Sequence, residues 1–441
     1  MVAYSRLLTQ EQYGHYQNFW VRMLLLLTIV TIGLPATLIT WSPDVIKAYA
    51  ARLRKNHYLL FGCWVLAGAI VFAVLERRAA VSVLVSCSLL LLYAIYTIQE
   101  ALLFAAKKFM TVSVANVLFF IWFVLVHFWV VRTGFELNRL FLLVGAGVML
   151  RSVIIGRELS RLWNSVRPAI LSEETVLSIR SLWMHLGLYD LTIVVFRWVD
   201  KFMISVFLSA GISAIYFNGS QDIPFLPLLL GAVSSSVLVQ LADRKEQAPL
   251  LAAGLLYRAG RLLSCIVLPL FFFLFFFARE LFLVAFSEKY LPSVIIFQVS
   301  LLVLPLRSYN YTAILQHLRR GDIINKGAVG DLIIACALMY PLYLALGLPG
   351  VALSFIISTW LQVAYYLFHI CRLTGVSLTA LLPLGNWLLK LLLFGGPLFA
   401  LHRLIRHHPE PLTVLISGAV LCAFLVLVSF IHEWRAQRPV A

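Results

Sequence analysis

Residues 23–39 read MLLLLTIVTIGLPATLI and residues 265–278 read CIVLPLFFFLFFFA, and neither stretch contains a charged side chain. Similar runs recur along the whole chain, in which 62% of the residues are hydrophobic and 12% are charged. The mean hydropathy is +0.94. A soluble protein of 441 residues with this composition would lack the polar side chains that are needed to cover its surface. The surrounding solvent is therefore predicted to be lipid.

The apolar runs also decide between the two structures that can cross a bilayer. Every backbone N–H and C=O group in lipid needs a partner within the protein, which leaves α-helices and closed β-barrels. Barrel strands alternate apolar and polar residues, whereas the runs here are unbroken. The sequence therefore predicts an all-α, polytopic bundle of transmembrane helices. At about 20 residues per crossing, about thirteen spans are expected, at 19–41, 58–76, 79–99, 112–131, 137–156, 182–208, 224–242, 260–285, 291–315, 326–346, 349–371, 384–402 and 412–432.

Lysine and arginine are distributed unequally between the two sides of the predicted bundle, and the net charge is +16. The side that holds Met1 is expected to carry Arg6, Arg77, Arg78, Arg132, Arg139, Arg279, Lys289, Arg403 and Arg406. The opposite side is expected to carry Lys47, Arg52, Arg54, Lys55, Lys107, Lys108, Arg157, Arg161, Arg167, Arg244, Lys245, Arg319, Arg320, Lys326, Arg372, Arg435 and Arg438. The positive-inside rule makes this second side the cytoplasm, so the C-terminus is predicted to be cytoplasmic and Met1 to lie outside. The basic excess predicts contact with anionic membrane lipids and does not indicate a nucleic-acid partner.

Short repeated patterns indicate two related halves. LTQEQYGHY at 8–16 is echoed by LSAGISAIY at 208–216, and the span end at 101–108 is echoed at 313–320, each running into a dibasic turn. Parallel repeats of this kind are found in many transporters. The predicted organisation is two pseudo-symmetric bundles at 1–156 and 181–373, a cytoplasmic amphipathic linker at 157–180, and an extra helix pair with a cytoplasmic tail at 374–441. A plain solvated linker is the alternative for 157–180.

Charged residues at membrane depth are the candidate site. On the span 182–208, Asp190, Arg197 and Lys201 fall within about 40° of one another around a helix, with Asp200 beside them. An arginine that faces lipid costs a few kcal/mol or more, so it is expected to meet water, an acid or a ligand. We expect Arg197 and Lys201 to bind substrate phosphate, and Asp190 or Asp200 to balance charge or take a coupling ion. The alternative is an ion pair to another helix for Asp190 and Arg197, and an interfacial anchor for Asp200 and Lys201.

Arg307 and Asn310 are the second pair of substrate-binding candidates. They follow Pro305 in the middle of the span 291–315, where a proline frees a carbonyl group and allows a helix to bend around a cavity. A satisfied kink is the alternative. Four further cations near span ends are expected to extend to the interface, and Glu100 is expected to be solvated. The four are Arg151, Arg258, Arg261 and Lys390.

The chain shows no signature of catalysis. It contains neither a GxxxxGK[ST] phosphate loop nor an HExxH motif. The 6 cysteines form no CxxC pair, so buried, unreactive thiols are expected. The protein is therefore predicted to be no enzyme and to hold no metal and no cofactor.

Four motifs resemble those of a known family. They are SRLLTQEQYGHY at 5–16, Asp200-Lys201 followed by the 208–216 motif, FSEKY at 286–290, and GLPGVAL at 347–353. In order and spacing they resemble the polysaccharide and O-antigen flippases of the multidrug/oligosaccharidyl-lipid/polysaccharide exporter superfamily. This resemblance implies that the protein moves a polyprenyl-diphosphate-linked oligosaccharide across the bacterial inner membrane by alternating access. It also implies other polysaccharide-assembly proteins as partners.

Three alternatives to this function stay open. The first is a drug or metabolite antiporter of the same superfamily, and the second is a membrane-embedded polymerase or glycosyltransferase. The third is a truncated, inactive relative, because the family has one more span before the first one seen here. That missing first helix is expected to be encoded upstream of Met1 or to have been lost.

Overall fold

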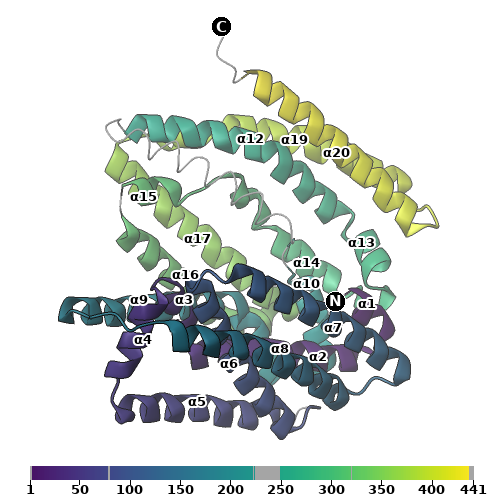
Figure 1. Ribbon diagram of the computed structural model, residues 1–441. Helices are drawn as coiled ribbons and strands as arrows, with labels where there is room; N and C mark the ends of the chain where they lie inside the picture. The colour runs from purple at the N-terminus through teal and green to yellow at the C-terminus, as the bar shows by residue number, and fades with distance from the viewer. Residues whose placement is uncertain (1, 78–79, 222, 224–248, 319, 437–441) are drawn as a thin grey trace. The chain divides into compact units, whose positions relative to one another are not determined.

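The computed structural model describes residues 2–77, 80–221, 223, 249–318 and 320–436. Within these residues every regular element is a helix (Figure 1), which confirms the predicted all-α fold. Some predicted features lie outside the described residues. They are the span 224–242 and the charged residues Arg78, Arg244, Lys245, Arg319 and Arg438.

Nine helices in the described part of the chain are long and apolar enough to cross a membrane. Each of them corresponds to one of the predicted spans. They are α5 (Lys55–Glu76), α6 (Val83–Ala105), α7 (Phe109–Thr133), α8 (Leu137–Ser165), α12 (Pro249–Phe276), α16 (Gly321–Leu346), α17 (Leu348–Thr374), α19 (Leu384–Ile405) and α20 (Pro411–Ala436).

Two further long helices carry more polar and charged residues. Helix α2 (Gln10–Thr31) starts at a capping box, in which the Thr9 side chain accepts from the Gln12 backbone N–H and the Gln12 side chain accepts from the Thr9 backbone N–H. It ends where Ile32 and Gly33 both adopt a positive φ, after which α3 (Leu34–Ile39) continues in a new direction. Helix α9 (Glu173–Phe207) is unbroken.

The predicted single span at 291–315 is wrong. The structure has three short pieces instead: α14 (Ser293–Leu301), the 3-10 helix η2 (Leu304–Ser308) and α15 (Ala313–His317). Pro305 lies at the start of η2 and cannot donate a backbone hydrogen bond. The preceding span is divided as well, because α12 ends at Phe276 and the short helix α13 (Ala278–Ala285) follows.

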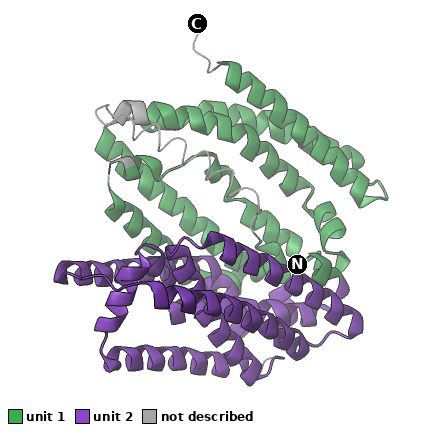
Figure 2. Ribbon diagram, viewed as in Figure 1, with its two compact units in different colours: residues 1–6, 215–441 green, residues 7–214 purple. Residues whose placement is uncertain are grey.

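The described residues form two compact units (Figure 2), which are residues 7–214 and residues 1–6 together with 215–441. In the first unit α2 packs against α5, α6 and α9, while α6 and α7 pack against α8. The short helix α4 (Pro43–Arg52) is held to the segment after α8, because Lys47 Nζ donates to the Val166 carbonyl oxygen at 2.8 Å.

In the second unit α12 is the central helix and packs against α19, α20 and η2, while α16 packs against α17. The N-terminal helix α1 (Val2–Leu7) is attached to this unit, since Arg6 Nε donates to the Ala285 carbonyl oxygen at 3.1 Å. Helix α10 (Ala210–Gly219) is joined to α14, because the Ser293 hydroxyl donates to the Ile215 carbonyl oxygen at 2.7 Å.

The segment predicted as a separate linker contains the ends of two long helices. Residues 157–165 continue α8, residues 166–172 are not helical, and residues from 173 onward belong to α9, which Ser172 caps. The compact units are defined by contacts and not by internal repeats. The two predicted repeats at 1–156 and 181–373 and the separate segment 374–441 therefore stay predictions.

Candidate functional site

The charged residues predicted on the span 182–208 lie on α9. Because α9 is continuous, Asp190, Arg197 and Lys201 share one face of it. Lys201 Nζ lies 3.2 Å from Asp200 Oδ2 and 5.9 Å from the centre of the Trp198 ring. The Asp200 side chain is buried. Its negative charge is balanced by Lys201, the next residue in the chain.

Arg197 and Asp190 are placed differently from this pair. Arg197 is exposed and Asp190 is half-buried. Neither of them makes an ion pair with a described residue, so the alternative of an ion pair to another helix has no support in this part of the chain. Arg197 is therefore an exposed cation within a long helix, and it makes no ion pair with any described residue.

Arg307 and Asn310 lie at the break between α14 and α15 rather than in a continuous span. Arg307 lies in the last turn of η2 with an exposed side chain. Asn310 Oδ1 accepts hydrogen bonds from the Thr312 backbone N–H at 3.2 Å and from the Thr312 hydroxyl at 3.1 Å. Asn310 therefore supports the turn into α15 with its carbonyl oxygen, whereas the Arg307 guanidinium is displayed on the surface of the unit.

Asp331 was not among the predicted site residues. It lies within α16, its side chain is 3% exposed, and its Oδ1 has no hydrogen-bond partner among the described residues. The groups that act on its carboxyl include the Ser358 hydroxyl on α17 and the Arg307 guanidinium. A carboxylate inside an otherwise apolar span is the sequence signal that could have identified it.

A polar cluster that was also not predicted joins α6, α7 and α8. The Tyr96 hydroxyl lies 2.6 Å from Glu100 Oε1 and 2.5 Å from Asn116 Oδ1, and Asn116 Nδ2 donates to Glu100 Oε1 at 2.8 Å. Arg151 donates to Asn116 Oδ1 at 3.1 Å and stacks on the rings of Tyr96 and Phe119. The expectation of a solvated Glu100 and an interfacial Arg151 was wrong, because complementary groups on neighbouring helices hold both inside the bundle.

A second charged cluster joins α12, α19 and α20. Lys390 is 5% exposed and Glu433 is 2% exposed, and Lys390 Nζ lies 3.1 Å from Glu433 Oε1. Arg261 Nη2 lies 2.8 Å from Glu433 Oε2, and Asn386 Nδ2 donates to Glu433 Oε1 at 2.6 Å. Arg261 and Lys390 were expected to extend to the interface, but Glu433 draws both inward, because a buried carboxylate needs cations as partners.

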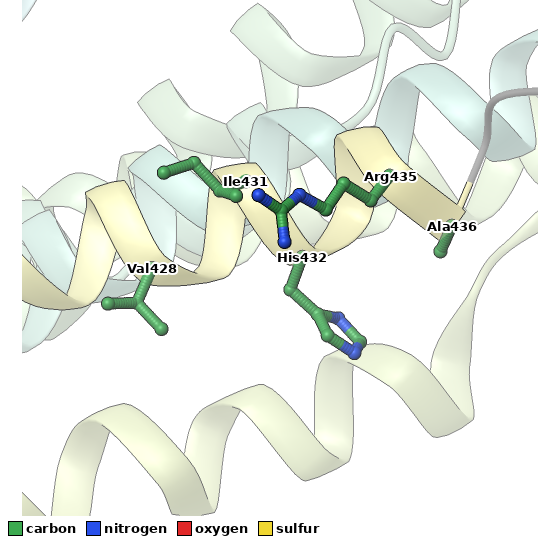
Figure 3. Close-up of a pocket in the computed structure, with 5 residues that line it drawn as sticks. All are labelled: Val428, Ile431, His432, Arg435 and Ala436. Atoms are coloured by element: carbon green, nitrogen blue, oxygen red, sulfur yellow. The ribbon is translucent and has the colours of Figure 1, made fainter.

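One hollow is visible at the end of α20, and none of the predicted site residues lines it. It is an open hollow of about 540 Å³, and the described residues that line it are Val428, Ile431, His432, Arg435 and Ala436 (Figure 3). The described residues contain no group of His, Cys, Asp and Glu side chains that could hold a metal ion. The candidate site is therefore defined by charged side chains.

Together these features define a multi-pass, α-helical membrane protein with charged side chains inside its spans. The family described as "Polysaccharide biosynthesis protein" matches residues 3–295, and the chain belongs to this family. No curated protein matches the chain.

The solved structure of "Lipid II flippase MurJ, inward closed conformation" has a similar fold. The TM-score is 0.68 at 16% sequence identity, and the alignment covers 99% of this chain and 95% of that chain. At this identity the likeness shows a shared fold. The predicted membership of a polysaccharide biosynthesis family is confirmed by the family match, and the fold is that of the solved flippase structure.

Proposed function

We propose that the protein is a flippase that moves a polyprenyl-diphosphate-linked oligosaccharide across the bacterial inner membrane for the synthesis of a surface polysaccharide. It works by alternating access and as a transporter rather than as an enzyme, with its C-terminus in the cytoplasm. The observation that carries this proposal is that a chain of a polysaccharide biosynthesis family has the fold of a lipid II flippase along nearly its whole length.

The charges of α9 support a diphosphate as the transported group. Arg197 is exposed and has no ion-pair partner in the described structure, and Lys201 lies one turn further along the same face. A guanidinium binds phosphate oxygens through two parallel hydrogen bonds, and charge-assisted bonds of this kind are the strong ones. In this proposal Arg197 is the main phosphate ligand and Lys201 assists it, while Arg307 is a separate candidate within its own unit.

The acidic residues have a supporting role in the same proposal. Asp200 forms an ion pair with Lys201 and so reduces the positive charge on this part of α9. Asp190 and Asp331 each lie within a long helix without an ion-pair partner among the described residues. We assign the coupling ion to one of these two carboxylates. The exposed Arg197 would repel a cationic drug, so a carrier of cationic drugs is the weaker interpretation.

The test is the fate of the lipid-linked oligosaccharide in cells. A strain that lacks the gene is expected to lose its surface polysaccharide and to accumulate the lipid-linked unit on the cytoplasmic face of the membrane. Purified protein in vesicles is expected to expose a labelled polyprenyl-diphosphate oligosaccharide to an enzyme added outside. Normal surface polysaccharide in the deletion strain, together with no flipping in vesicles, would contradict the proposal.

A further inference from the structure

A buried ion pair holds three helices of the unit formed by residues 7–214. Arg22 on α2 is 8% exposed, and Glu76, the last residue of α5, is 1% exposed. Arg22 Nη1 lies 3.1 Å from Glu76 Oε1. The same guanidinium reaches the end of α9, where Nε donates to the Ser205 hydroxyl at 3.2 Å and Nη2 donates to the Ser205 carbonyl oxygen.

These contacts satisfy backbone groups that the helices cannot satisfy themselves. The last four carbonyl groups of an α-helix have no partner within the helix. Ser205 belongs to this terminal group in α9 and Leu75 belongs to it in α5. Arg22 donates to both, because its Nη1 also lies 3.3 Å from the Leu75 carbonyl oxygen. A cation at the C-terminal ends of two helices is favoured by both helix dipoles, and Glu76 balances its charge.

A separate close contact holds the other half of α9 in the same unit. A Cβ atom on Gly33 would lie 2.4 Å from the Gly187 Cα atom, so the two backbones approach more closely than any side chain would allow. Trp183 Nε1 donates to the Ile32 carbonyl oxygen at 2.7 Å. The helix that carries the predicted phosphate-binding residues is therefore fixed at two levels along its length.

We propose that Arg22 is a positioning residue of the flippase, which fixes α9 within residues 7–214 so that Arg197 and Lys201 keep one depth and one orientation. The proposal rests on the proposed function, because it treats the α9 cations as the substrate site. The mechanical link is short, since Ser205 lies eight residues after Arg197, or about 12 Å along the helix axis. Arg22 itself touches no substrate.

The geometry requires arginine at this position. The guanidinium spreads its donors over Glu76, Ser205 and Leu75. Lysine presents three donors from a single nitrogen atom, so it can retain the ion pair but cannot reach all of these acceptors at once. Arg22→Lys is therefore expected to preserve folding and to release the end of α9.

The experiment measures hydrogen–deuterium exchange and flipping on the full-length protein in vesicles. Arg22→Lys is expected to raise exchange at residues 202–208 severalfold, to leave α17 unchanged, and to lower the flipping of a labelled polyprenyl-diphosphate oligosaccharide. Arg52→Ala is the matched control, because Arg52 contacts Glu173 at the opposite end of α9 at 3.0 Å on the surface. This control is expected to change neither measurement.

The double variant Arg22→Glu with Glu76→Arg distinguishes the contacts of Arg22 to the helix ends from its ion pair with Glu76. It can restore the ion pair but not the contacts to Leu75 and Ser205, so exchange at 202–208 is expected to stay high. Wild-type exchange in this double variant or in Arg22→Lys would overturn the proposal, as would unchanged flipping in Arg22→Lys. If the wild-type protein flips no lipid-linked sugar while Arg22→Lys still raises exchange, the proposed function fails and the fixation of α9 stands.

Discussion

Arg197 and Lys201 lie one turn apart on α9, but their surroundings differ. Lys201 is paired with the buried Asp200, whereas Arg197 is exposed and makes no ion pair with any described residue. A positive charge that is already paired must give up its partner before it binds a phosphate, and breaking a buried pair is costly. Arg197 has no such cost, so it is the residue that we expect to dominate phosphate binding.

The first prediction therefore concerns Arg197. Hydrogen bonds to charged groups contribute about 1.5–3 kcal/mol, and about 1.4 kcal/mol corresponds to tenfold. Arg197→Ala should lower polysaccharide export by about tenfold or more, and Arg197→Lys should keep part of it. Arg180→Ala is the matched control, because Arg180 is an exposed arginine on the same helix. Export at the wild-type rate by a normally accumulated Arg197→Ala protein would exclude this assignment and would favour Arg307.

The second prediction concerns Asp331, whose buried carboxylate has one oxygen without a partner in the described structure. If this group takes the coupling ion, Asp331→Asn should abolish the acceleration of flipping by an imposed proton or sodium gradient. Because asparagine keeps the shape of the side chain, the slower flipping without a gradient should remain. Asp322→Asn on the same helix is the control, since Asp322 is paired with Arg320 at the surface. Undiminished acceleration in Asp331→Asn would leave Asp190 as the candidate.

At the scale of helices, the cluster around Glu433 joins the C-terminal helix pair to α12. Arg261, Lys390 and Glu433 come from three different helices and carry two positive charges against one negative charge. Removing the carboxylate would leave two cations facing each other, one of them nearly fully buried. The cluster is therefore expected to stabilise the docking of α19 and α20.

The third prediction follows from this cluster. Removing one partner of a buried ion pair typically costs about 3–5 kcal/mol, so Glu433→Ala should lower the melting temperature of the detergent-solubilised protein clearly. Glu410→Ala is the control, because Glu410 precedes the same helix and is exposed. Equal melting temperatures for the two variants would show that the cluster contributes little to stability.

The helices were predictable where the apolar pattern is local. The ends of α5, α16, α17 and α19 lie within a few residues of the predicted spans, because charged and turn-forming residues end the apolar runs there. The division of 291–315 was not predictable from hydropathy, since apolar residues predominate in all three pieces in spite of Arg307, Gln316 and His317. Only the combination of Pro305 with a polar turn at Asn310 distinguishes this segment from a kinked helix.

The buried charges were less predictable, because their partners are far away in the sequence. Lys390 near a helix end could equally extend to the interface, and only the fold brings Glu433 to its side. Arg22 likewise reaches Glu76 and Ser205 through the packing of α2 against α5 and α9. A single sequence shows which residues are charged at membrane depth, but the faces that meet are set by tertiary packing.

At the scale of the whole molecule, the remaining prediction is the orientation of the chain in the membrane. Basic residues in short loops are retained on the cytoplasmic side during insertion. Arg372 and Arg435 lie in the last turns of α17 and α20. We predict that both helices end on the cytoplasmic side and that the segment 406–410 between α19 and α20 lies on the opposite side.

Reporter fusions on either side of α20 test this orientation directly. Alkaline phosphatase, which is active only outside the cytoplasm, should be inactive after Ala441 and active when inserted at Pro409, in the exposed segment between α19 and α20. A fluorescent protein that folds in the cytoplasm should show the reverse pattern. One helix, α20, separates the two positions, so the two reporters must give opposite results if this helix crosses the membrane. Activity of the phosphatase after Ala441 would invert every loop, and the α9 cations would then have to meet the diphosphate from the opposite direction.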